Sequence, residues 1–175
     1  MSAVTIVLTT GGSADSLLLA VEVLSQLPQR PPIIVVDNAS GSAAINAIRR
    51  RHPEVLLFAL NRDLGASSYA LGAAAASTPL VAFCGDDSWW TADSLWLAVR
   101  HFGAHSRLGL LTGRVLLWPD KIPDPAFPAP NRADGPARPL FSAGACVVRR
   151  SAFLDAGGFQ RRLPDGARER LLAFD

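Results

Sequence analysis

The chain has 175 residues, of which 49% are hydrophobic and 18% are charged, and its formal net charge is +2. This composition is typical of a globular domain with a substantial core, and it excludes a disordered chain. Lys121 is the only lysine, and the arginines occur singly or in short clusters. Such clusters do not resemble a nucleic-acid-binding tract, so we expect no nucleic-acid partner.

Two cysteines, Cys84 and Cys146, lie in separate apolar runs. Two isolated cysteines form neither a disulfide framework nor a zinc motif, so we expect buried thiols in a reducing compartment. The first ten residues lack the basic segment and the cleavage site of a signal peptide, and no apolar run is long enough to span a bilayer. We therefore expect the protein to be cytoplasmic.

The first hundred residues alternate four times between an apolar run and a helical pattern. The predicted strands cover residues 4–8, 33–36, 55–60 and 80–84. The predicted helices cover residues 14–27, 42–52, 65–76 and 92–102. Ser13 and Thr91 are suitable N-caps for the first and the last of these helices. This alternation predicts an α/β fold with a mainly parallel sheet flanked by helices.

The second half of the chain has a different sequence pattern. A strand bent at Gly113 is predicted over residues 108–118, and another over residues 142–150. Residues 119–139 are proline-rich and have no helix or strand period, so we expect a loop there, either a mobile excursion or a flap near a ligand. A single helical turn is expected over residues 151–156.

Residues 166–175 have the pattern of a helix that is only beginning where the sequence stops. We therefore expect a single domain over residues 1–175 whose C-terminal part is incomplete.

An acidic turn follows the fourth predicted strand, where Gly85 is followed by Asp86 and Asp87. Two adjacent carboxylates repel each other, so burying both requires a cation or strong hydrogen-bond donors. Such a turn is suited to a hard divalent metal with oxygen ligands. It is equally suited to the start of the next helix, where acidic side chains are favourable. Both interpretations remain open at this point.

Polar residues also follow the other three strands of the first half. If the strands are parallel, their carboxyl ends meet at one edge of the sheet, where ligands of such folds bind. An acidic edge favours a metal or the hydroxyls and amides of a nucleoside over a bare phosphate. Neither a G-x-G-x-x-G nor a G-x-x-x-x-G-K-[ST] motif is present. The converging clusters are Thr9-Thr10, Asp37-Asn38, Asn61 with Asp63, and Asp86-Asp87.

Four segments resemble the family-two glycosyltransferases of GT-A fold in their order and spacing. They are VTIVLTT, PIIVVDNAS, NRDLGASSYALGAAAASTPLVAFCGDDSWW and GACVVRRSAFLDAGGF, and they span nearly the whole chain. The resemblance implies a Rossmann-like nucleotide-sugar-binding fold. It also implies a nucleotide-binding half over residues 1–103 and an acceptor-side half over residues 104–175, which includes the proline-rich loop.

The resemblance implies a nucleotide-diphospho-sugar donor held at the acidic edge. Thr9 would lie beside the base, Asp37 would contact the uracil or ribose, and Asp86 would hold the ribose. Asn38 and Asn61, from the same polar clusters, are expected to complete the donor site. Asp87 would bind the divalent metal, Mn²⁺ or Mg²⁺, that stabilises charge on the leaving diphosphate.

The reaction implied is an inverting transfer of a sugar to an acceptor hydroxyl, and Glu169 falls on the position of the catalytic base. An alternative for Glu169 is a surface helix residue flanked by arginines. The acceptor is a saccharide, a lipid or a protein, and a lipid acceptor would bring the protein to the inner face of the membrane by peripheral association.

The sequence departs from the family pattern at three places. Gly85 stands where an acid is common, Tyr69 replaces the arginine of an Arg-Asn pair, and Arg168 replaces the acid before the base. These departures motivate a second hypothesis, in which the chain is a catalytically impaired homologue that binds a nucleotide or a protein. A nucleotidyltransferase ranks last, because the turn after the first strand has no basic residue to bind a triphosphate.

Three tryptophans lie near the acidic turn. Trp89 and Trp90 are expected either to wall the acceptor or sugar site, since indole faces stack on sugar rings, or to pack the start of the next helix. Trp96 is expected to pack in the core.

Overall fold

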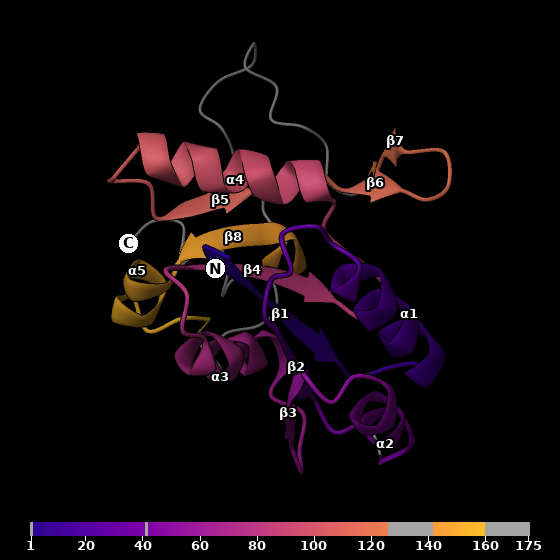
Figure 1. Ribbon diagram of the computed structural model, residues 1–175. Helices are drawn as coiled ribbons and strands as arrows, with labels where there is room; N and C mark the ends of the chain where they lie inside the picture. The colour runs from indigo at the N-terminus through magenta and orange to yellow at the C-terminus, as the bar shows by residue number, and fades with distance from the viewer. Residues whose placement is uncertain (1, 41, 126–141, 160–175) are drawn as a thin grey trace.

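The computed structural model describes residues 2–40, 42–125 and 142–159. The fold is built around one six-stranded sheet (Figure 1). β8 is antiparallel to both of its neighbours, while the other strands share one direction, which confirms the predicted mainly parallel sheet. Across the sheet the strands are β3 (Leu56–Ala59), β2 (Ile33–Asp37), β1 (Val4–Thr10), β4 (Leu80–Gly85), β8 (Cys146–Arg149) and β5 (Leu110–Thr112).

Helices cover both faces of this sheet, as Figure 1 shows. One face packs against α1 (Ala14–Ser25), α2 (Ser42–Arg51) and α4 (Ala92–Ala104). The other face packs against α3 (Ser68–Ala75), which follows the short 3₁₀ helix η1 (Gly65–Ser67), and against α5 (Arg150–Asp155).

The position of β1 in the sheet explains why its sequence is a continuous apolar run. Its alternate side chains enter the two different cores: Ile6 and Leu8 pack towards α1, and Val7 packs towards α3. All three side chains are fully buried, as expected for a central strand of a parallel sheet that is covered on both faces.

The predicted N-caps are confirmed. The Ser13 hydroxyl accepts a hydrogen bond from the Ser16 amide at the start of α1. Thr91 and Ser94 form a reciprocal capping box at the start of α4, in which each hydroxyl accepts from the other residue's amide. These local bonds fix the point at which each helix begins, and they can be recognised from sequence alone.

Two expectations for the second half were wrong. The strand predicted over residues 108–118 is two strands, because β5 ends at Thr112 and Leu116–Leu117 form β6 in a separate hairpin. The partner strand of that hairpin is β7 (Ile122–Pro123), inside the stretch that was predicted to have no strand.

The break after β5 has a local cause. The Gly113 amide donates to Ala145 O at 2.7 Å, and a side chain at Gly113 would meet the Trp90 ring at 3.0 Å. The chain is therefore held close to the indole at the point where β5 ends.

The strand predicted over residues 142–150 begins with a 3₁₀ helix, η2 (Ala143–Ala145), and only then becomes β8. The predicted single turn over residues 151–156 is α5, which begins one residue earlier. The helix expected over residues 166–175 and the remainder of the proline-rich stretch, residues 126–139, lie outside the described residues.

Arg149 and Arg150 serve as helix caps. The Arg149 guanidinium donates to Phe102 O and His105 O near the end of α4, and the Arg150 guanidinium donates to Ala73 O and Ala74 O of α3 at 2.8 Å. Cations at helix C-termini satisfy unpaired carbonyls and complement the helix dipole. This arginine pair therefore stabilises the fold at the end of the sheet opposite the acidic turn.

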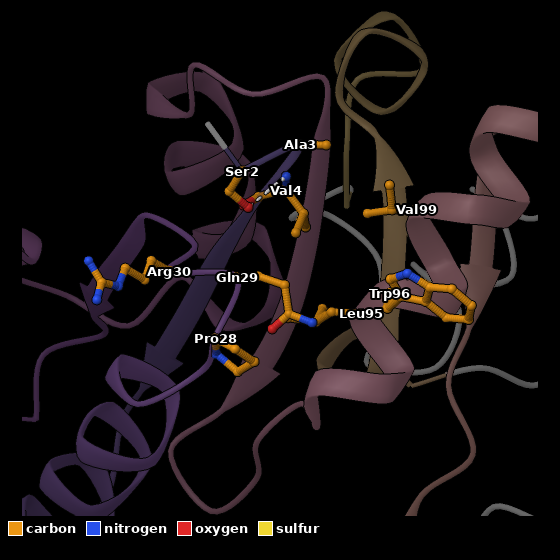
Figure 2. Close-up of a pocket in the computed structure, with 9 residues that line it drawn as sticks. All are labelled: Ser2, Ala3, Val4, Pro28, Gln29, Arg30, Leu95, Trp96 and Val99. Carbon is orange, nitrogen blue, oxygen red and sulfur yellow. Dashed lines mark hydrogen bonds between the residues drawn. The ribbon is translucent and has the colours of Figure 1, made fainter.

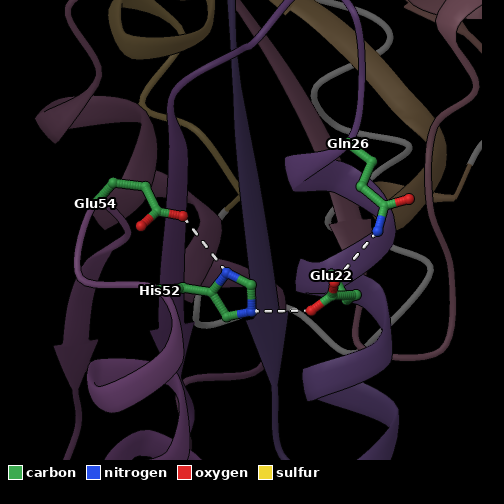
Figure 3. Close-up of polar contacts among 4 residues, drawn as sticks. All are labelled: Glu22, Gln26, His52 and Glu54. Atoms are coloured by element: carbon green, nitrogen blue, oxygen red, sulfur yellow. Dashed lines mark hydrogen bonds and ion pairs between the residues drawn. The ribbon is translucent and has the colours of Figure 1, made fainter.

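His52 links α1 to the connection between α2 and β3 (Figure 3). Its Nε2 lies 3.4 Å from Glu22 Oε2, and its Nδ1 lies 3.4 Å from Glu54 Oε1. Glu22 also accepts from the Gln26 side chain at 3.2 Å. The imidazole is buried, whereas both glutamates are exposed.

The expectation that Trp96 packs in the core was wrong, because its side chain is 53% exposed on α4 with the Arg100 guanidinium over its ring. Both cysteines are buried and unpaired, as expected. Among the helices that the structure describes, none is both long and apolar enough to cross a membrane.

Candidate functional site

The strand register brings the predicted polar clusters to one edge of the sheet. Thr10 at the end of β1 pairs with Asp37 at the end of β2, and Asp37 pairs with Ala59 at the end of β3. On the other side of β1, Thr9 pairs with Gly85 at the end of β4. The carboxyl ends of four parallel strands therefore meet, and the candidate site lies at this edge.

Asp86 is tied directly to the end of β1. The Thr10 hydroxyl donates a hydrogen bond to Asp86 Oδ2, and it also accepts from the Gly12 amide at 3.4 Å. A side chain at Gly12 would come within 3.2 Å of the same carboxylate oxygen. The turn after β1 therefore packs closely on Asp86. Thr9 was the threonine expected in the site, whereas Thr10 makes the contact with the acid.

Asp37 is buried, with 3% of its surface exposed, and it organises the turn that follows β2. Its Oδ1 accepts from both the amide and the hydroxyl of Ser40. Asp37 is therefore held in a fixed orientation on the same face of the sheet as Thr10.

Asn38 connects the first and third loops of the edge. Its amide donates to Thr10 O at 2.6 Å, and its side-chain oxygen accepts from the Leu64 amide at 2.7 Å. Its side-chain nitrogen donates to Gly65 O at 3.4 Å. Asn61 lies two residues beyond the end of β3 and is exposed. Asn38 thus has a clear role in holding the loops, while Asn61 is placed at the rim.

The two acids of the turn differ in their surroundings. Asp86 is half-buried against Thr10, while Asp87 is exposed. In the described part of the chain, no three His, Cys, Asp or Glu side chains gather into a metal-binding group. A protein that binds Mg²⁺ together with a phosphate ligand commonly supplies only one or two carboxylates, so Asp87 suits that kind of site. Glu169 lies outside the described residues.

Three side chains bond to the backbone of three successive residues just before the acids. The Trp90 indole donates to Phe83 O at 2.9 Å, and the Tyr69 hydroxyl donates to Cys84 O at 3.1 Å. The Ser88 hydroxyl accepts from the Gly85 amide at 3.0 Å. Trp90 is buried, so of the two interpretations offered for it, packing at the start of α4 is the one that the structure supports.

The neighbouring tryptophan has a different environment. Trp89 is half-buried, and its ring meets Trp118 of the β6–β7 hairpin edge-on, with 6.2 Å between centroids. Trp118 is 69% exposed. Since β5 runs parallel to β4, the chain after β5 leaves the sheet at the edge that carries the acidic turn. The aromatic pair therefore stands beside the candidate site.

A separate pocket of about 510 Å³ lies at the opposite edge of the sheet (Figure 2). It is formed by the start of β1, the turn after α1 and the exposed side of α4. Among the described residues that line it, Arg30 is the only charged one, and Trp96 forms one wall. The pocket is open and lacks the carboxylates that the acidic edge provides, so we do not assign it to the same chemistry.

Residues 5–156 match the sequence model of glycosyl transferase family 2. The chain belongs to this family. No curated protein sequence matches it significantly. Family membership agrees with the resemblance that the acidic turn and its neighbouring segments had indicated.

Solved structures show which fold this family member has. A mannosyltransferase, PcManGT from Pyrobaculum calidifontis in complex with GDP-Man and Mn²⁺, is 20% identical with a TM-score of 0.71, over 92% of this chain and 48% of that chain. S. aureus TarS 1–349 is 15% identical with a TM-score of 0.75, over 98% of this chain and 54% of that chain. The same TarS fragment in complex with UDP-GlcNAc gives a TM-score of 0.72 at 12% identity, over 98% of this chain and 52% of that chain.

The fold is therefore the GT-A glycosyltransferase fold, as predicted. The chain spans about half the length of these solved structures.

Proposed function

We propose that this family member binds a nucleotide-diphospho-sugar at the acidic edge and transfers the sugar to an acceptor hydroxyl with the help of a divalent metal. The observation that carries the proposal is the convergence of Thr10, Asp37 and Asp86 at the ends of three adjacent strands. Ordered carboxylates at this position suit the hydroxyls and amides of a nucleoside.

The donor would be held by residues from all four loops. Thr9, Asp37, Asn38, Asn61 and Asp86 remain the proposed contacts to the nucleotide-sugar. Burial and the Ser40 bonds support Asp37 as a preoriented acceptor for a nucleoside hydroxyl or imide. Asn38 supports the site indirectly, since its side chain is engaged by the loop after β3.

Asp87 is proposed as the metal ligand. Its exposed carboxylate at the end of β4 can share a Mn²⁺ or Mg²⁺ ion with the oxygens of the donor diphosphate. A metal ion bound there would stabilise the negative charge that develops on the leaving diphosphate. PcManGT was solved with GDP-Man and Mn²⁺, which makes the same combination reasonable for this chain.

The proposed reaction is a single displacement with inversion at the anomeric carbon. The acceptor oxygen forms a bond to that carbon as the bond to the diphosphate oxygen breaks, and a carboxylate takes the proton of the acceptor hydroxyl. Glu169 is the proposed base. Replacing Glu169 with Gln should lower the transfer rate by about 10²-fold to 10⁴-fold and leave donor binding intact. Equal turnover by Glu169→Gln would eliminate this assignment.

Calorimetric titration of UDP, GDP and dTDP, each with and without Mn²⁺, tests the donor site. We expect one nucleotide to bind preferentially and its binding to require the metal. Asp87→Ala should abolish the metal-dependent part of the binding, while Asp93→Ala, which removes another exposed acid in the first turn of α4, should not. Binding to Asp87→Ala that matches the unaltered protein would remove Asp87 from the site.

A second candidate function is nucleotide or protein binding without turnover. Asp86 is already bonded to Thr10, so the exposed Asp87 is the one acid of the described turn that is left for a metal. This small number of metal ligands favours the second candidate. Tight nucleotide binding with no transfer to any saccharide or lipid acceptor would select this candidate.

The acceptor is proposed to meet the aromatic pair Trp89 and Trp118. Exposed indole faces suit the apolar face of a sugar ring, and the pair stands at the edge where the donor would bind. The β6–β7 hairpin also exposes Leu116, Leu117 and Ile122, so a lipid-linked acceptor at a membrane surface would be accommodated there.

A further inference from the structure

The end of β4 pairs with β1 as far as Gly85 but lacks strand pairing on its other side. The pairing of β4 with β8 ends at Ala82, three residues before Gly85. Beyond that point η2 replaces a strand, and Gly144 lies so close that a side chain there would meet the Gly85 amide at 3.4 Å and the Tyr69 hydroxyl at 3.2 Å. The segment that carries the acids is therefore held by something other than regular strand pairing on this side.

Three side chains provide that support, and we refer to Tyr69, Ser88 and Trp90 as the turn clamp. They bond to Cys84 O, the Gly85 amide and Phe83 O respectively, so three successive residues of β4 are each fixed by a side chain. Tyr69 comes from α3 on one face of the sheet, and Trp90 belongs to the core on the other face. The end of β4 is thus held by side chains from both faces of the sheet.

Tyr69 is the member of the clamp that reaches from a distant element. Its ring lies 4.8 Å from the Phe83 ring and 6.0 Å from the Phe159 ring, measured between centroids, so the position of the hydroxyl is set by packing. The hydroxyl donates its one proton to Cys84 O. This bond joins α3 to the end of β4.

Burial raises the pKa of the Tyr69 hydroxyl well above its usual range. The group therefore remains a neutral donor throughout the physiological pH range. A permanent donor of this kind suits a structural bond that must not change with conditions.

We propose that Tyr69 is a positioning residue for the donor site, which fixes the end of β4 and the acidic turn relative to α3 so that Asp86 and Asp87 meet the nucleotide and its metal in one arrangement. This inference rests on the proposed function, since it concerns the same donor site. The substrate contacts themselves belong to other residues.

Tyr69→Phe tests the inference because it removes one hydroxyl and keeps the ring. We expect Mn²⁺-dependent binding of the preferred nucleotide, UDP or GDP, to weaken by about fivefold or more, as for the loss of one buried hydrogen bond. Hydrogen exchange should also become faster at the amides of residues 85–90, measured by mass spectrometry without any ligand.

Thr78→Val is the matched control. Thr78 is buried, and its hydroxyl bonds to Leu80 O at 2.8 Å, at the opposite end of β4. The Thr78 hydroxyl also shares a hydrogen bond with the Thr5 hydroxyl at 2.7 Å, so this variant should be destabilised at least as much as Tyr69→Phe. It should leave both nucleotide binding and the exchange of residues 85–90 unchanged.

The two readouts separate the two proposals. If the unaltered protein binds no nucleotide, the proposed donor site fails, and the exchange measurement alone decides whether Tyr69 fixes the turn. If Tyr69→Phe exchanges at residues 85–90 as slowly as the unaltered protein, or binds nucleotide equally well where binding is seen, the inference is overturned. The same holds if Thr78→Val reproduces both effects.

Discussion

Thr10 illustrates what a single residue contributes and why its role was hidden. β1 is apolar on both faces, so the sequence pattern does not reveal which of Thr9 and Thr10 points to which side. In the structure Thr10 shares the face of Leu8 and bonds to Asp86, while Thr9 lies on the face of Val7 and meets Tyr69. Only the packing of the helices decides between the two threonines.

Thr10→Val should weaken donor binding without unfolding the protein. The valine keeps the shape of the side chain but leaves Asp86 without its donor, and a lost hydrogen bond to a charged group costs about 1.5–3 kcal/mol. Calorimetric titration with the preferred nucleotide should show about a tenfold or greater rise in Kd. Thr112→Val, at an exposed position at the end of β5, is the control and should bind normally.

Tyr69 also allows a prediction about how the stability of the protein depends on pH. It is the only tyrosine in the sequence, so the ultraviolet absorbance of tyrosinate reports this residue alone. Its pKa is raised from an ordinary value of 10.0, so above that pH the unfolded chain loses a proton that the folded chain keeps. The contribution of Tyr69 to stability is therefore complete below about pH 10 and declines as the pH rises further.

Between about pH 9 and about pH 11, the free energy of unfolding should fall by about 1.4 kcal/mol more in the unaltered protein than in Tyr69→Phe. Urea denaturation at both pH values measures this difference. The tyrosinate absorbance should appear together with unfolding. Tyrosinate that forms in the folded protein at its ordinary pH would show that the hydroxyl is accessible.

At the scale of elements, the first half of the chain could be predicted well because its signals are local. Apolar runs of strand length, helical periodicity and the N-caps Ser13 and Thr91 all lie within a few residues of what they specify. The direction of β8 could not be predicted, because its pairing with β4 and β5 joins residues that are far apart in sequence. The same holds for the two-residue strands β6 and β7.

The close packing of α3 on β1 is a further element-scale feature. At Gly72 an added methyl group would lie 2.3 Å from Val7 Cγ1, so the helix cannot approach the strand with any side chain there. Gly72→Ala should therefore lower the free energy of unfolding by about 1–3 kcal/mol or more, because overpacking forces neighbouring groups to move. Thermal or urea denaturation measures the loss.

Gly103→Ala is the matched control for this prediction. Gly103 lies in α4, where an added methyl group would meet nothing within 4 Å. Alanine has the better helix propensity, so this variant should be more stable by about 0.5–1 kcal/mol. If Gly72→Ala were equally stabilising, the close contact between α3 and β1 would not exist.

At the scale of the whole molecule, the topology explains how residues from distant loops form one candidate site. Parallel strands with crossover helices deliver every loop after β1, β2, β3 and β4 to the same edge, so the sequence could predict where the polar clusters meet (Figure 1). It could not predict the hydrogen bonds of the clamp, which depend on how α3 and η2 pack around β4. The division into halves at residue 103, and the role of Glu169, stay predictions.

The β6–β7 hairpin is the other whole-molecule feature, since it stands away from the sheet at the edge of the candidate site (Figure 1). If Trp118 receives the acceptor sugar, Trp118→Ala should raise the KM for a saccharide acceptor by about fivefold or more and leave the Kd of the donor nucleotide unchanged. Its exposure predicts little change in stability.

Trp96→Ala is a matched control, because Trp96 is also largely exposed but lines the pocket at the opposite edge (Figure 2). It should leave both constants unchanged. An equal effect of the two variants would mean that the loss of an exposed indole disturbs the protein generally, and the hairpin would then have no special relation to the acceptor. An effect of Trp118→Ala on the donor Kd alone would instead place the hairpin at the nucleotide-sugar, on the donor side of the reaction.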